Sequence, residues 1–288
     1  MRLMPRGWPG KQTASLWERL AQPRPPLPIL VGGAEGGVGT STVTALLAEL
    51  IAAASPGPTI AVDQCGTAWG SLTRRLVGQQ VGLRAGLART LLGEHVDPHE
   101  VISMAPTTSA GAALIDDRAG YTSLHDLLRL ISVTSGAITV DAGRVDNVFA
   151  ARLDLQPVVV VVGRADVIGA EAACAAVTFL REHTTRARLP AEPLVVLSSV
   201  GATGSLTERR RSQAATTLVT ATGISHLVHL PHDPRLAAGQ PLRLDQVGKS
   251  TAIAGMRMAS VVGHIQGEIY RAYRRPAASA AAAGSTAR

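Results

Sequence analysis

The sequence predicts an α/β fold in which a mainly parallel sheet lies between two layers of helices. Apolar runs of strand length alternate along the chain with helix-like stretches, which is the order expected for parallel strands joined by crossover helices. Several of these runs are continuous and β-branched rather than alternating with polar residues, as in strands that are covered on both faces. Hydrophobic residues make up 46% of the 288 residues but aromatic ones only 3%, so the core must be built from alanine, valine, leucine and isoleucine.

Six runs have the composition of buried strands. In chain order they are Pro28–Gly32, Thr59–Asp63, Ala137–Asp141, Pro157–Gly163, Pro193–Ser198 and His226–Pro231.

Six longer stretches are predicted to be helices. They are Thr40–Ala54, Ser123–Ser132, Val145–Leu153, Asp166–Thr184, Ser205–Thr222 and Thr251–Tyr273. The segment from Arg84 to Ile115 shows no clear period and gives no prediction.

The two ends of the chain differ in composition from the middle. Residues 1–27 form a proline-rich N-terminal tail with a short helix at Thr13–Ala21 and two tryptophans, Trp8 and Trp17. The tail is either a flexible tether or an arm that binds a partner, since an exposed tryptophan is costly without a purpose. Residues 276–288 are rich in alanine and are expected to be a disordered tail. The folded domain is therefore expected at residues 28–275.

Charge and cysteine content exclude several classes of protein. Two cysteines, Cys65 and Cys174, cannot form a disulfide framework, which favours a cytoplasmic location. The apolar run Pro157–Val162 is far shorter than the ~20 residues that a membrane-spanning helix needs. The formal net charge of +7 permits contact with a DNA backbone but does not require it.

A glycine-rich turn joins the first predicted strand to the first long helix. Gly32–Thr42 reads GGAEGGVGTST. Glycines let the backbone approach a ligand closely, and the N–H groups and dipole of the following helix attract anions. The sequence therefore predicts a phosphate site at this turn.

This turn resembles a known motif. Glu35–Thr42, EGGVGTST, is similar to the deviant Walker A motif KGGVGK[ST][ST] of the MinD/ParA family of P-loop ATPases, including its CpaE/TadZ-like and conjugation-associated branches. AVDQCG at Ala61–Gly66 and TVDAG at Thr139–Gly143 resemble the two switch regions of that family. The resemblance covers most of residues 28–270 and implies a three-layer P-loop NTPase fold.

The resemblance also implies a site for ATP or ADP with Mg²⁺. It assigns the nucleotide to Glu35, Gly36, Gly37, Val38, Gly39, Thr40, Ser41 and Thr42. It assigns catalysis to Asp63 and Asp141, and Mg²⁺ to those two carboxylates together with Ser41.

Three replacements remove charge from this site. Glu35 stands where the family has its signature lysine, and Thr40 stands where it has the Walker lysine. Cys65 stands where it has the second switch I aspartate. A charge-assisted hydrogen bond contributes roughly 1.5–3 kcal/mol, so nucleotide binding is expected to be weak. A cation that acts across a dimer can raise the rate by about 10³–10⁵, so hydrolysis is expected to be slow or absent. Arginines just after the switch regions could compensate: Arg74, Arg75 and Arg144.

Other charged and metal-binding patterns have simpler interpretations. GKST at Gly248–Thr251 is expected to be a helix start, and His226, His229 and His232 are not expected to form a zinc site, because side chains alternate along a strand. Arginines are also clustered at Arg209–Arg211 and at Arg271, Arg274 and Arg275, where they are either a solvated surface or contacts to DNA phosphates.

Three functions remain open from the sequence. The first is a degenerate MinD/ParA-like protein that acts as a positioning or scaffold factor, with a protein partner, in a cytoplasmic assembly for pili, secretion, conjugation or partitioning. The second is an active ATPase of that family with an unusual site, and the third is a DNA-binding module. A homodimer is possible, but Glu35 would face phosphates with a repulsion of roughly 4 kcal/mol at about 4 Å. ATP is therefore not expected to drive dimerisation.

Overall fold

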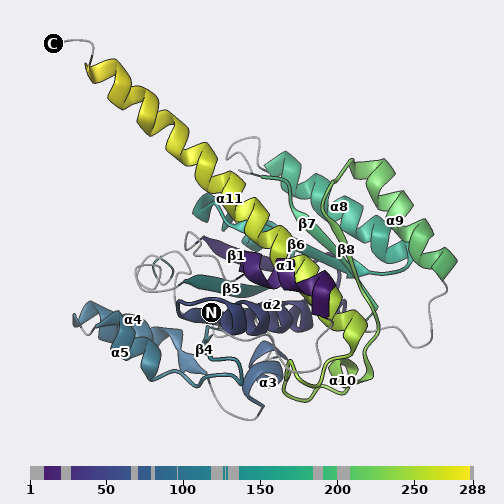
Figure 1. Ribbon diagram of the computed structural model, residues 1–288, viewed down its shortest axis with the longest axis horizontal. Coiled ribbons are helices and arrows are strands. Elements are labelled where there is room, and N and C mark those ends of the chain that lie inside the picture. Colours follow the sequence, from purple (N-terminus) through teal and green to yellow (C-terminus); the bar gives the residue numbers. More distant parts are fainter. Residues whose placement is uncertain are drawn as a thin grey trace.

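The fold is a three-layer α/β sandwich around one sheet of eight parallel strands (Figure 1). The computed structural model describes residues 10–20, 27–65, 71–78, 82–95, 97–117, 126, 128, 136–183, 191–199 and 208–285. The strands lie in the order β3-β4-β2-β5-β1-β6-β7-β8, and every strand pair in the sheet is parallel. The predicted three-layer P-loop fold is confirmed.

The strands are short; the six inner ones are almost completely buried, and the two edge strands are partly exposed. Their bounds are β1 Pro28–Gly33, β2 Thr59–Asp63, β3 Leu83–Arg84, β4 Ala112–Asp116, β5 Ala137–Arg144, β6 Val158–Arg164, β7 Leu194–Ser198 and β8 Leu227–Leu230. Strand β1 lies between β5 and β6. Because all strands are parallel, their carboxyl ends lie at one edge of the sheet, where ligands bind in open α/β folds.

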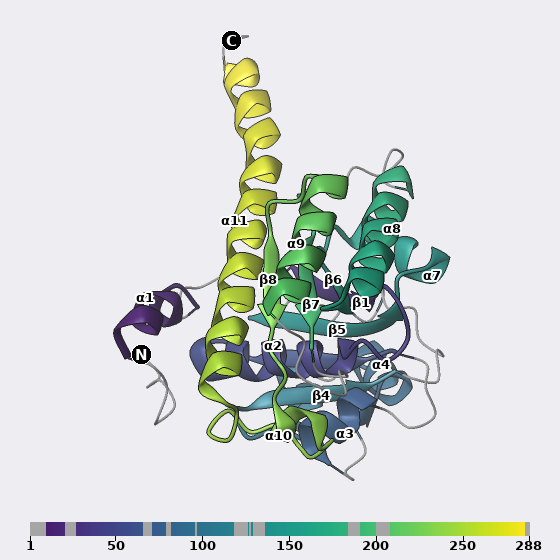
Figure 2. The same ribbon diagram turned by 90° about the vertical axis from the view of Figure 1, so that its right-hand side faces the viewer.

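Helices cover both faces of the sheet (Figure 2). They are α1 Gly10–Leu20, α2 Thr40–Ala54, α3 Ser71–Val77, α4 Ala85–Gly93, α5 Pro98–Ser103, α7 Asn147–Ala150, α8 Val167–His183, α9 Glu208–Thr222, α10 Pro234–Ala237 and α11 Lys249–Ser285, with a 3₁₀ turn at Leu153–Leu155. Helices α1, α2, α3 and α11 share one apolar core with the sheet. Helices α4, α5, α7, α8 and α9 share the other.

All six predicted strands are present, with ends that differ by no more than three residues, but two further strands were not predicted. Strands β3 and β4 fall in the segment from Arg84 to Ile115 or at its edges. The predicted helix at Val145–Leu153 is wrong in extent, because α7 ends after a single turn and a 3₁₀ turn follows. The predicted helix at Ser123–Ser132 lies mostly outside the described residues.

The N-terminal segment contains a helix that packs onto the domain. Helix α1 contacts α11 and α2, and Trp17, only 3% exposed, belongs to the same core cluster as these helices. The Gln266 side chain also donates a hydrogen bond to the carbonyl of Leu27 (3.1 Å). The expected tail at residues 1–27 therefore includes an element of the domain.

Helix α11 is longer than predicted. It begins at Lys249, within the GKST sequence, which is a helix start as expected, and continues to Ser285. The expected boundary at residue 276 falls inside this helix, whose far end extends beyond the rest of the chain (Figure 1). No helix in the described ranges combines the length and the apolar character needed to span a membrane.

Candidate functional site

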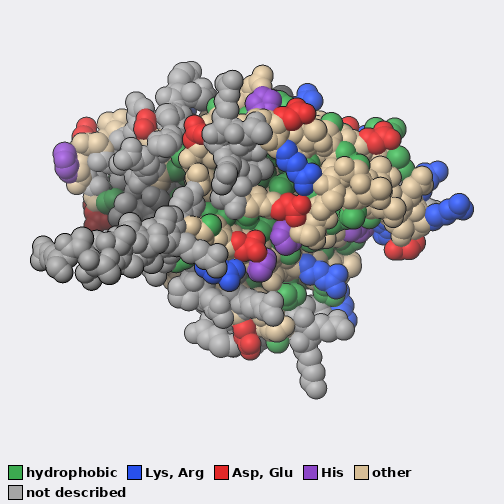
Figure 3. All heavy atoms as spheres, turned by 90° about the horizontal axis from the view of Figure 1, so that it is seen from above, with side chains coloured by type: hydrophobic (Ala, Val, Ile, Leu, Met, Phe, Trp, Pro, Cys, Tyr) green, Lys and Arg blue, Asp and Glu red, His purple; other side chains and the backbone are tan. Residues whose placement is uncertain are grey.

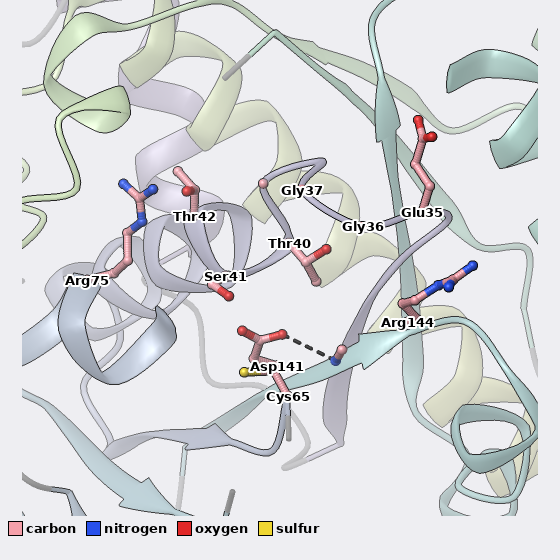
Figure 4. A pocket seen from close by; sticks show the side chains of 12 residues that line it. Glu35, Gly36, Gly37, Thr40, Ser41, Thr42, Cys65, Arg75, Asp141 and Arg144 are labelled. Carbon is pink, nitrogen blue, oxygen red and sulfur yellow. Dashed lines mark hydrogen bonds between the residues drawn. The ribbon is translucent and has the colours of Figure 1, made fainter. Parts of the chain in front are cut away.

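A cavity of about 450 Å³ lies at the carboxyl edge of the sheet, over the start of α2 (Figure 4). Its lining residues are Glu35, Gly36, Gly37, Gly39, Thr40, Ser41, Thr42, Cys65, Arg75, Asp141, Gly143 and Arg144. Seven of the eight residues predicted to bind nucleotide therefore line one cavity. Val38 does not, because its side chain is buried in the core beneath the loop.

The backbone of the glycine-rich loop has the shape of an anion cradle. Gly37 and Gly39 have φ angles of 75° and 93°, a left-handed conformation that glycine adopts without strain. A Cβ atom on Gly36 or Gly37 would meet nothing within 4 Å, so the space above the loop is open. The first N–H groups of α2 have no partner within the helix, and they attract an anion there.

Glu35 forms an ion pair within the chain. Its Oε1 lies 3.3 Å from Nε of Arg164, which is the last residue of β6. The carboxylate of Asp166 forms an ion pair with the same nitrogen. In Figure 4 the Glu35 carboxylate points away from Ser41 and Asp141. The sequence did not predict this pair, although β6 is next to β1 in the sheet and brings Arg164 to the loop.

Asp141 lies at the floor of the cavity and is completely buried. Its Oδ1 accepts a hydrogen bond from the N–H of Gly143 at 3.3 Å, while Oδ2 has no hydrogen-bond partner among the described residues. Burial raises the pKa of the Asp141 carboxyl to about 7; the Ser41 hydroxyl and the Gly143 N–H lower it, and the charge of Asp63 raises it further. Burial therefore outweighs the two hydrogen bonds and favours the protonated form of this carboxyl.

Asp63 is buried beside the cavity but does not line it. Its Oδ2 accepts hydrogen bonds from the N–H and the hydroxyl of Thr73, at 2.9 Å and 2.7 Å, and its Oδ1 accepts one from the Cys65 thiol at 3.3 Å. Asp63 thus connects β2 to helix α3. The predicted catalytic pair is close together, but only Asp141 faces the cavity.

Two arginines line the cavity, on opposite sides of the glycine-rich loop (Figure 4). These are Arg75 and Arg144; Arg74, the third arginine considered from the sequence, is not in the lining. Arg75 donates a hydrogen bond to the carbonyl of Leu236, and its pKa is lowered by burial and by the charge of Arg74. No lysine within the described part of the chain lines the cavity.

The residues present fit a phosphate-bearing ligand better than they fit Mg²⁺. The open glycine cradle, the helix start and the two arginines are all suited to phosphate oxygens. Mg²⁺ prefers an octahedral set of oxygen ligands. Of the three predicted ligands, Ser41 and Asp141 line the cavity, whereas both oxygens of Asp63 already accept hydrogen bonds from Thr73 and Cys65. The Mg²⁺ site predicted at Ser41, Asp63 and Asp141 therefore stays a prediction.

Polar side chains also gather at the carboxyl ends of β7 and β8. The Ser199 hydroxyl lies 3.0 Å from Nε2 of His229, and Nδ1 of His232 lies 3.3 Å from the carbonyl of Ser199. Burial lowers the pKa of His229, and the charge of Arg211 lowers it further. His226 instead faces His264 of α11, with ring centroids 6.0 Å apart, so the three histidines do not converge.

The fold is similar to those of several solved proteins. A ParA family ATPase from Chlorobium tepidum matches with a TM-score of 0.62 and 17% identity, over 81% of this chain and 98% of its own. The MinC:MinD cell division protein complex of Aquifex aeolicus matches with a TM-score of 0.57 and 16% identity, over 81% of this chain and 94% of its own. MinD of Pyrococcus horikoshii, complexed with Mg-ADP, matches with a TM-score of 0.55 and 18% identity, over 85% of this chain and 98% of its own.

Sequence comparison alone finds less: no family model and no curated protein matches the chain. The structural similarity establishes a MinD/ParA-like P-loop fold, as the glycine-rich loop predicts.

Proposed function

We propose that this chain binds a nucleotide weakly, hydrolyses it slowly or not at all, and acts as a positioning or scaffold factor in a larger cytoplasmic assembly. The observation that carries the proposal is the lining of the cavity. It keeps the glycine cradle of a P-loop, but Thr40 occupies the position of the Walker lysine and Cys65 that of the second switch carboxylate. Phosphate binding can survive these losses, whereas transition-state stabilisation is weakened most.

The ligand and the partner are inferred from the neighbours of the fold. One neighbour is a complex with Mg-ADP, which supports ATP or ADP as the ligand here. Another is a complex of MinD with MinC, which supports a protein partner for a chain with this fold. Pilus, secretion, conjugation and partitioning machinery are assemblies in which such a factor would act.

Calorimetric titration with ATP and ADP, with and without Mg²⁺, tests the nucleotide. We expect weak binding that changes little when Mg²⁺ is omitted. Replacing Gly39 by valine should abolish it, because the left-handed backbone at this position (φ 93°) strains a β-branched residue. Gly223→Val is a matched control, since Gly223 also has positive φ (65°) but ends α9 away from the cavity. Unchanged affinity in Gly39→Val would contradict the proposed site.

A second candidate, an active ATPase that uses arginine, is favoured by Arg75 and Arg144 in the lining. It predicts Mg²⁺-dependent phosphate release that falls by at least about 10-fold in Arg144→Ala. Arg74→Ala is the control, because Arg74 is adjacent in sequence to a lining arginine and lies outside the cavity. No phosphate release above background in the parent protein would exclude this candidate.

A DNA-binding role has less support. On the face seen in Figure 3, basic side chains alternate with acidic ones among the coloured atoms and form no continuous basic surface there. Binding to phosphates of DNA should weaken steeply with salt, so titration of duplex DNA at increasing salt concentration distinguishes this role from the others.

A further inference from the structure

Three metal-ligating side chains lie together, two in the lining of the cavity and one beside it. A carboxylate oxygen of Asp63, the sulfur of Cys65 and a carboxylate oxygen of Asp141 all lie within 4.8 Å of one another. Both aspartates are fully buried, and Cys65 is half-buried in the cavity wall. Strands β2 and β5 are adjacent and pair Asp63 with Asp141, so the sheet itself fixes two of the three ligands.

A second observation, an unpartnered buried oxygen, is also consistent with cation binding. Oδ2 of Asp141 is buried without a hydrogen-bond partner in the described residues, and a second carboxylate stands next to it. A buried carboxylate oxygen without a partner is costly. A cation held between the two aspartates would supply that partner and offset their mutual repulsion.

The spacing of the donors suits a small tetrahedral ion. Cys65 Sγ and Asp63 Oδ1 are 3.3 Å apart. Sulfur and oxygen bound to one tetrahedral Zn²⁺ are separated by about 3.5 Å, given the usual metal–ligand lengths. The ligand oxygen of Asp141 lies within 4.8 Å of both other donor atoms. Cys65 and Asp141 both line the cavity, so an ion can reach them from it.

We propose that Asp63, Cys65 and Asp141 form a binding site for a thiophilic divalent cation of the Zn²⁺ class. In the metal-free chain the Cys65 thiol donates its proton in a hydrogen bond to Asp63. On metal binding this proton is released to solvent, and the sulfur coordinates as a thiolate. A thiolate selects Zn²⁺ or Co²⁺ over Mg²⁺, which prefers oxygen. The metal site requires no nucleotide. An experiment can therefore exclude the metal site while nucleotide binding is confirmed, or exclude nucleotide binding while the metal site is confirmed.

Co²⁺ binding to the untagged chain, without nucleotide, tests the site. We expect one Co²⁺ per chain, a sulfur-to-cobalt charge-transfer band, displacement by Zn²⁺ and no displacement by excess Mg²⁺. Cys65→Ser should remove the band and weaken Co²⁺ binding by at least about 10–100-fold. The matched control is Cys174→Ser on α8, which removes the other cysteine and should leave the band unchanged. Asp141→Asn should weaken binding while the far-ultraviolet circular dichroism stays the same.

Thiol alkylation gives a readout that needs no variant. Zn²⁺ should slow the reaction of Cys65 with iodoacetamide, located by peptide mass, and should leave Cys174 unaffected. Three results would overturn the proposal: no charge-transfer band in the parent protein, a band that survives Cys65→Ser, or displacement of Co²⁺ by Mg²⁺. Equal alkylation of Cys65 with and without Zn²⁺ would overturn it as well.

Discussion

Two side chains decide the charge that the glycine-rich loop presents. Glu35 lies 3.3 Å from Nε of Arg164, with 27% of the glutamate side chain exposed, and it shares this arginine with Asp166. The Thr40 side chain is half-buried and lies against Gly33, since a Cβ atom added to Gly33 would be only 2.5 Å from Oγ1 of Thr40. The loop therefore offers backbone N–H groups to an anion but no side-chain cation of its own.

The residue scale gives a direct prediction for Thr40. Thr40→Lys restores a cation to the loop and should tighten nucleotide binding by about 10–100-fold, the equivalent of one charge-assisted hydrogen bond. Calorimetric titration measures the change. Thr220→Lys, at an exposed position of α9, adds the same charge elsewhere and should have no effect. Equal affinities in the parent and in Thr40→Lys would mean that the loop does not receive phosphates.

A buried carboxyl on α2 predicts a pH dependence. Glu49 is fully buried, and its Oε2 accepts a hydrogen bond from the Ser109 hydroxyl at 2.8 Å. Burial raises the pKa of Glu49, against the lowering effect of hydrogen bonds from Thr108, Ser109 and Ala110. The folded state therefore holds this proton more tightly than the unfolded state.

The sign follows from that difference. The stability that the proton contributes is complete below the pKa of the unfolded state, and it is lost as pH rises through the higher pKa of the folded state. Relative to the parent protein, Glu49→Gln should gain stability between about pH 5 and about pH 8. Urea unfolding at both pH values measures this. Glu94→Gln, an exposed substitution on the segment after α4, should show no such trend; the same trend in both variants would exclude Glu49 as its source.

At the scale of elements, helix α2 is the centre of the site. Twelve of its residues are buried, among them the polar side chains Thr42, Thr44 and Glu49. The helix begins at Thr40, directly after its N-cap Gly39, and it packs against β5, α3 and α11. Its first turn is therefore fixed from several sides, which keeps the anion-binding N–H groups in place.

Local sequence predicted the elements that carry the site. The bounds of α2 and β2 agree with the prediction to the residue, because a glycine-rich turn and a continuous apolar run mark them. Strand β4 was missed because the segment from Arg84 to Ile115 shows no clear period; its place between β2 and β3 is set by tertiary pairing. The Glu35–Arg164 pair could not be predicted, since strand adjacency and not sequence distance brings its two residues together.

Helix α1 should contribute to the stability of the domain. Trp17→Ala removes a ring that is only 3% exposed, on a helix that packs against α11 and α2. Truncation of a buried tryptophan costs about 3–5 kcal/mol, and we expect a lower thermal unfolding midpoint. Differential scanning calorimetry measures the change, and Trp17→Phe should recover most of it. A midpoint equal to that of the parent would show that α1 packs too weakly to affect global unfolding.

At the scale of the whole molecule, the Glu35–Arg164 pair bears on association. The resemblance to the MinD/ParA family implies a cation at this position in a nucleotide-driven dimer, and this chain has a carboxylate that lies beside Arg164. We expect the mass measured by analytical ultracentrifugation to stay the same when Mg-ATP is added, in the parent protein and in Glu35→Ala. A monomer-to-dimer shift in the parent that disappears in Glu35→Ala would show instead that the carboxylate is an interface contact.

The central position of β1 affects how the chain folds during synthesis. Strand β1 ends at Gly33, but its two neighbours are completed only at Arg144 and Arg164. At ribosomal rates of about 5–20 residues per second, the apolar strand waits on the order of 10 s for both partners. Over that interval the nascent chain exposes unpaired strand edges, so a slower translation rate or a saturated chaperone supply should lower the soluble yield more than it changes the stability of the finished protein.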